Sequence, residues 1–264
     1  MRQIKLILEY NGAAYAGWQR QAGVCTIQEI LEEKLGVLLQ HPARASAAGR
    51  TDAGVHALGQ VVCFRTDSVL PIDKVRKGLN ALLPEDIAVV DAAEASIDFD
   101  PRHDAAGKLY RYLVWNHPSR PALLRNRVWH QREPLDLEAM RAAAKDLLGE
   151  HDFSAFRASG CESKTAERNL RRLEILPWTT PEVSQTLEGV GGPSAATGDA
   201  LIAFEVEATA FLRYMVRNLV GTLVEVGTGR RGVGEMAGIL ASRDRQQAGR
   251  TAPARGLTLV RVMY

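Results

Sequence analysis

The sequence predicts an α+β protein of two similar halves, in which largely antiparallel sheets are flanked by helices. Strand-like and helix-like patterns punctuate each other without strict alternation. The order strand, helix, strand, helix, strand fills the first half and returns with additions in the second, although no letter-for-letter repeat accompanies it. We expect an N-terminal half over 1–104 and a C-terminal half over 105–264, because Pro101 and Gly107 interrupt any regular pattern near the join.

The N-terminal half opens with a strand over 3–9, where every second residue is apolar. A capping box at 26–29 then begins a helix with apolar residues at helical spacing. Pro71 opens a second helix and Pro84 stops it. Two further strands are expected around 61–64 and over 87–90.

The C-terminal half repeats this rhythm with more elements. Strands are expected over 109–115, 170–177, 201–207 and 257–263. Helices are expected over 136–148, 211–226 and 233–241. The Gly-rich segment 187–199 between two of these strands is typical of a flexible hairpin loop.

Length and composition indicate a protein of the cytoplasm. The 264 residues, 46% of them hydrophobic and 24% charged, suffice for one large domain or two modest ones. The longest apolar runs are far shorter than a membrane span, and the N-terminus has no secretory signal pattern. Cys25, Cys63 and Cys161 are widely spaced and odd in number, so they fit neither a disulfide framework nor a zinc site. We therefore expect no membrane and no metal.

Basic residues gather in two runs, although the net charge of +2 is too small to indicate a nucleic-acid partner by itself. The first run, at 164–172, carries Lys164, Arg168, Arg171 and Arg172 against the single acid Glu167. The second, at 243–255, carries four arginines against one aspartate. Either run alone fits an ordinary solvated face. Both runs, together with the site below, favour a polyanionic partner.

The segment 47–60 is a candidate catalytic loop. It reads Ala-Ala-Gly-Arg-Thr-Asp-Ala-Gly-Val-His-Ala-Leu-Gly-Gln, so Arg50 and Asp52 stand among small residues that leave space for a ligand. A turn with a local Arg50–Asp52 pair explains the same letters equally well.

Arg217 lies within the helix expected over 211–226, whose apolar residues cover most of its circumference. A guanidinium buried there needs a carboxylate, and Arg213 and Gly221 occupy the positions one turn away. Asp52 is a good candidate for that partner. The alternative, which we rank lower, is that Arg217 extends along the helix to the surface.

Tyr110 shares one face of its expected strand with Tyr112 and Val114. Aromatic residues in strands are usually part of the core. A tyrosine that lines a cleft could instead stack on a base and use its hydroxyl as an acid or base.

These segments together resemble the tRNA pseudouridine synthase A family. The resemblance centres on Gly49-Arg50-Thr51-Asp52. The matching segments, in order along the chain, are 9–21, 48–56, 60–62, 80–84, 108–112, 152–157, 211–218 and 251–257. An ordered set over nearly the whole chain is not expected by chance. The loop at 187–199 is longer than the family suggests and lies away from these motifs.

The resemblance implies roles for individual residues. It places the catalytic aspartate at Asp52, the active-site tyrosine at Tyr110 and the basic partner of the aspartate at Arg217. It associates Arg50 with positioning the site and opening the target nucleotide. It also implies a homodimer without cofactor or metal, and a common basic cleft between the two halves. The implied substrate is the tRNA anticodon stem–loop, at uridines 38, 39 and 40, rather than DNA.

The implied reaction suits these residues. It breaks the N1–C1′ bond, rotates the detached uracil and forms a C5–C1′ bond, after the uridine has left the stack. Asp52 could attack C1′ or add to C6, and the sequence leaves both routes open. Arg217 would favour the ionised form of Asp52. Tyr110 would hold the uracil and could remove the C5 proton, while Arg168, Arg171 and Arg172 are expected to bind RNA.

Two other classes of function are weighed against this one. A non-catalytic RNA-binding protein, or tRNA chaperone, would bind tRNA without forming product. A nucleoside hydrolase would use Asp52 to release free uracil, but the known enzymes of that class hold a metal in an aspartate cluster, and no such cluster is visible here.

Overall fold

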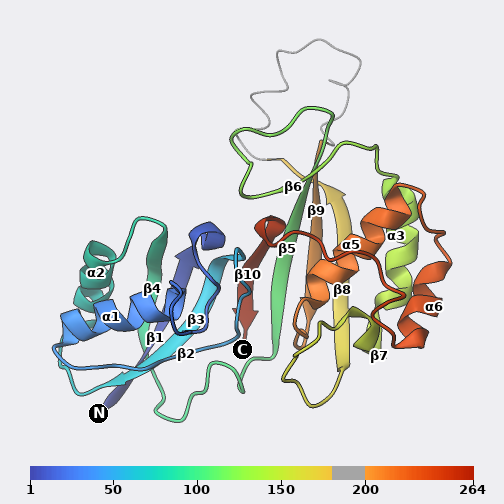
Figure 1. The fold of residues 1–264 in the computed structure, drawn as a ribbon. Helices are drawn as coiled ribbons and strands as arrows, with labels where there is room; N and C mark the ends of the chain where they lie inside the picture. The colour runs from blue at the N-terminus through green and yellow to red at the C-terminus, as the bar shows by residue number, and fades with distance from the viewer. Residues whose placement is uncertain (180–199) are drawn as a thin grey trace. The chain divides into compact units, whose positions relative to one another are not determined.

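The computed structural model describes residues 1–179 and 200–264, so the expected loop at 187–199 lies outside the described residues. It confirms the α+β class, with mainly antiparallel strand pairs and five α-helices among the described residues (Figure 1). The chain forms two compact units. The first comprises Met1–Leu109 with Thr258–Tyr264, and the second comprises Tyr110–Leu257.

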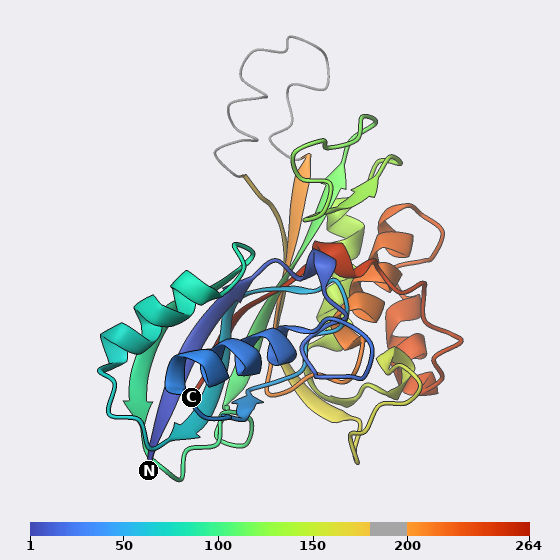
Figure 2. The same cartoon turned by 60° about the vertical axis from the view of Figure 1, so that its left-hand side comes forward.

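The first unit is a sheet with helices on one face. Its strands are β1 (Arg2–Tyr10), β2 (Ala45–Ala47), β3 (His56–Thr66), β4 (Ile87–Ala95) and β10 (Leu257–Met263). They follow the order β4-β1-β3-β10, with β2 also on β3. β1 runs antiparallel to β3 and β4, whereas β10 runs parallel to β3. Helices α1 (Ile27–Leu39) and α2 (Ile72–Leu82) lie side by side over the strands (Figure 2).

Alternation along β1 explains this packing. Ile4, Leu6 and Leu8 are fully buried, as the period-two pattern predicts. The predicted capping box is also present, because the Thr26 side chain accepts a hydrogen bond from the Glu29 N–H. From there α1 packs Leu31 and Leu35 into the core.

The second unit also covers one face of its strands with helices. Its strands are the greater part of β5 (Gly107–Asn116), then β6 (Trp129–Gln131), β7 (Gly149–Asp152), β8 (Glu167–Pro177) and β9 (Leu201–Ala208). They follow the order β5-β9-β8-β7, with β6 paired to β5. Helices α3 (Leu137–Ala144), α5 (Met215–Gly227) and α6 (Glu235–Ser242) pack together on this unit (Figure 1).

Several elements differ from expectation. The expected helix over 211–226 begins only at Met215, because Tyr214 before it takes a left-handed conformation with φ 62°. α3 ends at Ala144 and continues as a short 3-10 turn to Leu147. β2, β6 and β7 were not predicted, since three or four residues are too short for a periodic signal. The last strand pairs with β3 and so joins the first unit. No helix among the described residues is long and apolar enough to cross a membrane.

Candidate active site

The first unit contains the loop that carries Asp52, just before β3. Asp52 is half-buried, and its carbonyl accepts a hydrogen bond from the Val55 N–H at 3.1 Å. The Gly54 N–H donates to the Tyr15 carbonyl at 3.3 Å. The backbone on either side of Asp52 is therefore fixed to its surroundings, and its carboxylate belongs to a defined turn.

A buried polar network holds the residue next to Asp52. The Thr51 hydroxyl lies 2.8 Å from the Tyr10 hydroxyl, and the Thr51 carbonyl accepts from the Trp18 N–H at 3.0 Å. The Gln60 amide donates to the Gly49 carbonyl at 2.8 Å and to the Tyr10 hydroxyl at 3.4 Å. Burial raises the pKa of Tyr10 to about 12, despite its hydrogen bonds to Thr51 and Gln60. The Tyr10 hydroxyl is therefore a neutral positioning group at neutral pH.

Gly17 lets the chain approach this loop closely. It has φ +97°, a conformation that residues with a side chain rarely adopt. A Cβ built on Gly17 would lie 2.6 Å from the Thr51 carbonyl oxygen and 3.0 Å from the Ala53 nitrogen. Glycine is thus required for the segment at 15–18 to pack against the backbone around Asp52.

Arg50 is exposed, in contrast to Thr51 and Gln60. Its Nε donates to the Gln19 side-chain oxygen at 3.0 Å. The guanidinium is thereby tied to the loop that precedes α1.

In the second unit, Tyr110 lies on β5 and is only 8% exposed. Its ring meets Phe211 edge to face, with centroids 5.1 Å apart. Tyr110 is therefore well packed, as the core interpretation of this strand expects. The packing fixes the direction of its ring, which a stacking platform also needs.

Arg217 is half-buried rather than buried, and it is the third residue of α5 rather than central in a helix. The late start of α5 explains both differences. Its Nε donates to the Ala252 carbonyl at 2.7 Å, and its guanidinium lies 4.4 Å from the centre of the Tyr214 ring. These contacts hold the side chain within the unit, so Arg217 does not simply extend into solvent.

Sequence reasoning did not single out Tyr112 or Tyr214 as parts of this region. Burial raises the pKa of Tyr112, although the positive charges of Arg217, Arg255 and Arg250 oppose that rise. The Tyr112 hydroxyl donates to the Pro253 carbonyl at 2.7 Å. Clustered arginines near a buried tyrosine are a signal that only the fold reveals, because these residues are far apart in the chain.

The three arginines expected to bind RNA occupy different environments on β8. Arg172 forms an ion pair with Glu205, which also binds Arg111. Arg168 is half-buried and donates to the carbonyls of Thr165 and Glu167, and burial lowers its pKa. Arg171 is exposed and has no hydrogen-bond or ion-pair partner within 1–179 and 200–264. Arg171 is the member of the set best placed to meet a ligand in solvent.

Metal-binding clusters and free thiols are the remaining sources of chemistry to consider in this protein. Nowhere in 1–179 and 200–264 do three or more His, Cys, Asp or Glu side chains gather as a metal site. Cys25 is an exposed thiol, Cys161 is half-buried, and burial raises the pKa of the buried Cys63 to about 11.

Comparison with known proteins places this chain in a family. A family model described as tRNA pseudouridine synthase matches residues 6–104 and 143–264, and the chain belongs to that family. The chain is 51% identical to tRNA pseudouridine synthase A of Myxococcus xanthus, over all of this chain and 92% of that protein. It is 46% identical to the protein of that name from Geotalea uraniireducens and 44% identical to that from Acetivibrio thermocellus, each over 100% of both chains.

Proposed function

We propose that this protein isomerises uridine to pseudouridine in the anticodon stem–loop of tRNA, at positions 38, 39 and 40, with Asp52 as the nucleophile. Membership of the tRNA pseudouridine synthase family supports the class of reaction and the substrate. The N1–C1′ bond breaks and a C5–C1′ bond forms. C5 loses a proton and N1 gains one, so the reaction needs no oxidant or reductant.

The observation that carries this assignment is the fixed backbone around Asp52. Thr51 is bonded through both its hydroxyl and its carbonyl, and the Asp52 carbonyl accepts from Val55 within the same turn. A carboxylate on such a support loses little conformational freedom when it meets a substrate, which is the geometry that nucleophilic catalysis requires.

We assign the remaining roles on the same basis. Arg217 pairs with Asp52 and favours its ionised form, which an attacking carboxylate requires. Tyr110 stacks on the detached uracil and removes the C5 proton. Arg50, which is exposed and donates to Gln19, helps to open the target nucleotide. The two units form the halves of a common basic cleft in this proposal.

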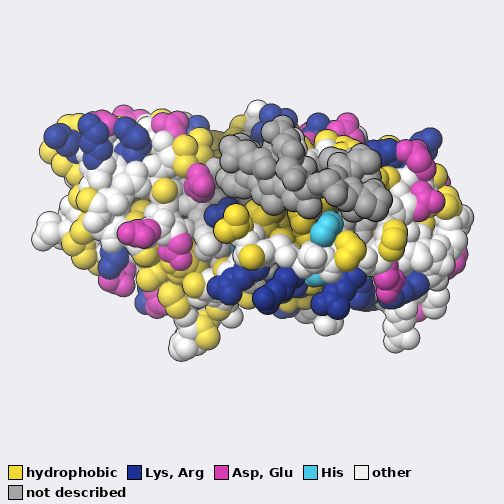
Figure 3. Space-filling model, turned by 90° about the horizontal axis from the view of Figure 1, so that it is seen from above, with side chains coloured by type: hydrophobic (Ala, Val, Ile, Leu, Met, Phe, Trp, Pro, Cys, Tyr) yellow, Lys and Arg dark blue, Asp and Glu magenta, His cyan; other side chains and the backbone are white. Residues whose placement is uncertain are grey.

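RNA binding depends on charge that is spread over the surface. Figure 3 shows Lys and Arg side chains gathered in a band along the lower edge of the face that it draws. Such a band suits the phosphates of RNA, which dominate the affinity of nucleic-acid complexes. The proposal includes a homodimer that acts on tRNA in the cytoplasm and has no role on DNA or membranes.

The proposal is tested by incubating the protein with an unmodified tRNA transcript and mapping pseudouridine by nucleotide position. We expect product at one or more of positions 38–40 and no free uracil. Free uracil would instead identify a hydrolase. Tight binding to tRNA without either product would identify an RNA-binding protein or chaperone. Product at other positions would contradict the assignment of the anticodon stem–loop.

A further inference from the structure

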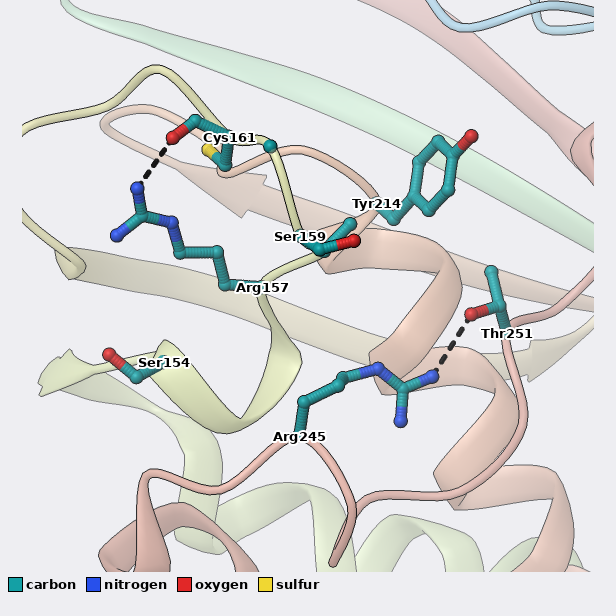
Figure 4. A pocket seen from close by; sticks show the side chains of 9 residues that line it. Ser154, Arg157, Ser159, Cys161, Tyr214, Arg245 and Thr251 are labelled. Atoms are coloured by element: carbon teal, nitrogen blue, oxygen red, sulfur yellow. Dashed lines mark hydrogen bonds between the residues drawn. The ribbon is translucent and has the colours of Figure 1, made fainter.

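The second unit contains a cavity of about 700 Å³ that the assigned roles leave unused. Three segments form its walls: the turn after β7, the start of α5, and the chain that follows α6. Figure 4 shows Arg157 and Cys161 on one side and Tyr214 on the other, with Arg245 below. The cavity is large enough for a nucleotide-sized group. Its lining has two arginines and several hydroxyl groups but no aspartate or glutamate.

Arg157 is preorganised to bind an anion. Its Nη2 donates to the Cys161 carbonyl at 2.6 Å and to the Ser163 carbonyl at 2.8 Å. These two bonds fix the plane of the guanidinium. Within residues 1–179 and 200–264 its Nε and Nη1 donate to no nitrogen or oxygen atom, and the side chain also interacts with the Cys161 thiol. A planar donor fork held in this way is the group that best matches the oxygens of a phosphate.

Arg245 supplies charge rather than free donors. Its terminal nitrogens donate to the carbonyls of Ala248 and Gly249 at 3.2 and 2.9 Å, to Asn218 at 3.1 Å and to Thr251 at 3.0 Å. All four acceptors are neutral. In the described part of the chain, no carboxylate forms an ion pair with Arg157 or Arg245. Asp152 and Glu225 act on these two arginines only at longer range, because they form their ion pairs with Arg243 and Arg231, so the cavity retains positive charge that an anion would compensate.

The Cys161 thiol is affected by the Arg157 side chain. Burial alone would raise the pKa of its thiol, but the Arg213 N–H, the contacts with Ser163 and the Arg157 side chain together lower it. The Arg213 N–H lies 3.5 Å from the sulfur. The thiol lines the cavity and is half-buried, so it serves as a built-in reporter of what fills the cavity.

The cavity is next to Arg217. Tyr214 forms part of its wall, and the same ring lies 4.4 Å from the Arg217 guanidinium. Tyr214 has φ 62°, a left-handed conformation that is uncommon for a residue with a large side chain. A group held in the cavity is thus separated from Arg217 by one aromatic ring.

We propose that this cavity binds one phosphodiester of the RNA, adjacent to the nucleotide that meets Arg217, with Arg157 as its hydrogen-bond donor. The inference rests on the proposed function, because that function makes RNA the ligand. It assigns a specific phosphate contact to a residue outside the two basic runs of the sequence. Arg157 selects which nucleotide is presented to the site by fixing the position of a neighbouring phosphate.

The first test uses the thiol as a reporter. In a Cys25→Ser background, Cys161 is the accessible thiol, because Cys63 is buried. Its alkylation by iodoacetamide is measured with and without a saturating synthetic anticodon stem–loop RNA. We expect the RNA to slow alkylation about tenfold and millimolar inorganic phosphate to have little effect. Equal rates with and without bound RNA would overturn the proposal, as would protection by inorganic phosphate alone, which identifies a site for a free anion.

The second test links Arg157 to a single phosphate. Stem–loop RNAs carrying one neutral methylphosphonate each are bound to the wild-type protein and to Arg157→Gln. We expect a methylphosphonate at one position to lower the affinity of the wild type about tenfold, because charged hydrogen bonds contribute on this scale. The same substitution should not lower the affinity of Arg157→Gln any further, since that variant already lacks the contact. The Arg157→Gln variant should also lose about one unit of salt-dependence slope, which Arg157→Lys restores.

Arg141→Gln is the matched control, since Arg141 lies on α3, outside the cavity, and binds Glu138 and the Ile175 carbonyl. Additive losses at every phosphate position would contradict the proposed contact. If the wild type forms pseudouridine while these tests fail, only the cavity assignment is wrong. If it forms none, the proposed function itself fails.

Discussion

The loop around Asp52 and the surroundings of the Arg157 cavity differ in the kind of interaction that holds them, which is neutral in the first and charged in the second. In the first unit, neutral and fully buried groups fix the loop, namely Tyr10, Thr51 and Gln60. In the second unit, Arg157 and Arg245 bind carbonyl groups and form no ion pair with a carboxylate in the described part of the chain. Neutral hydrogen bonds define a position without attracting ions, whereas uncompensated charge attracts a polyanion without fixing a reacting atom. The first region is thus suited to position a reacting group, and the second is suited to bind RNA.

Apart from the loss of Asp52 itself, the largest effect is expected at Arg217, which would link the two functions. Arg217→Ala removes the proposed partner of Asp52, so turnover at saturating tRNA should fall about 10²- to 10³-fold. Arg213→Ala is the matched control, because Arg213 also lies near the Tyr214 ring, at 5.1 Å, but is exposed. It should weaken binding while leaving turnover nearly intact. Single-turnover rates that fall equally in both variants would remove the distinction between them.

Gly17→Ala tests the close packing that holds the backbone around Asp52 in place. The new methyl group would clash with the Thr51 carbonyl oxygen and impose an unfavourable φ, so we expect a loss of about 3 kcal/mol in the free energy of unfolding. Gly23→Ala is the control, because Gly23 also has positive φ, +77°, but no atom of the described residues lies within 4 Å of a built Cβ. Its cost should be about 1 kcal/mol. Denaturant melts that give both variants the same stability would show that the contact with Thr51 contributes nothing.

Tyr10→Phe probes the same network more gently. It removes the hydroxyl that lies between Thr51 and Gln60 while keeping the ring, so it should cost about 1–2 kcal/mol in stability. Turnover should fall several-fold at unchanged tRNA affinity, since the variant displaces the support of Asp52 and touches no RNA contact. Because Tyr10 stays protonated at neutral pH, its loss should leave the shape of the pH–rate profile unchanged. A defect confined to tRNA affinity would show that the network does not position the loop.

The smallest effect is expected on β8. Arg171→Ala removes an exposed side chain that has no partner among the described residues, so it should weaken tRNA binding a few-fold and reduce the salt slope by about one unit, with no change in melting temperature. Arg172→Ala instead breaks the pair with Glu205, so it should lower stability by about 1 kcal/mol. Salt titrations and thermal melts on the two variants separate these outcomes. If only Arg172→Ala showed a salt-dependent loss of binding, Arg172 and not Arg171 would be the residue that contacts RNA.

Local signals in the sequence predicted much of the fold. The alternation of β1 and the Thr26 cap of α1 both depend on neighbouring residues, and both are present. The pairing of β10 with β3 joins residues about two hundred positions apart, as between Thr258 and His56, and leaves no local trace in the sequence. The left-handed Tyr214 that delays α5 is likewise fixed by tertiary contacts, since tyrosine has no intrinsic preference for it.

For the candidate site, the sequence indicated Asp52 but not the residues that hold its loop. Asp52 could be named because its loop combines small and polar residues in a family-like motif. The residues that hold this loop could not be named from sequence. Tyr10 and Gln60 reach Thr51 and Gly49 only because β1 and β3 pair in the folded chain. The basic run at 164–172 looked uniform in sequence, yet Glu205 on β9, together with Glu174, places Arg172 in a different environment from Arg171. Charge runs show how many arginines are present, whereas the fold determines which of them have a partner.

The most direct test of the central claim is the pseudouridine yield of Asp52→Ala on an unmodified tRNA transcript under single-turnover conditions, beside the wild type. Binding of tRNA is measured on the same samples, so that a loss of catalysis can be distinguished from a loss of tRNA binding. We predict that the variant binds tRNA nearly as well as the wild type, because one carboxylate changes little of a phosphate-dominated affinity, and forms no pseudouridine. Pseudouridine formed by Asp52→Ala at the wild-type rate would contradict the assignment of Asp52 as the catalytic carboxylate.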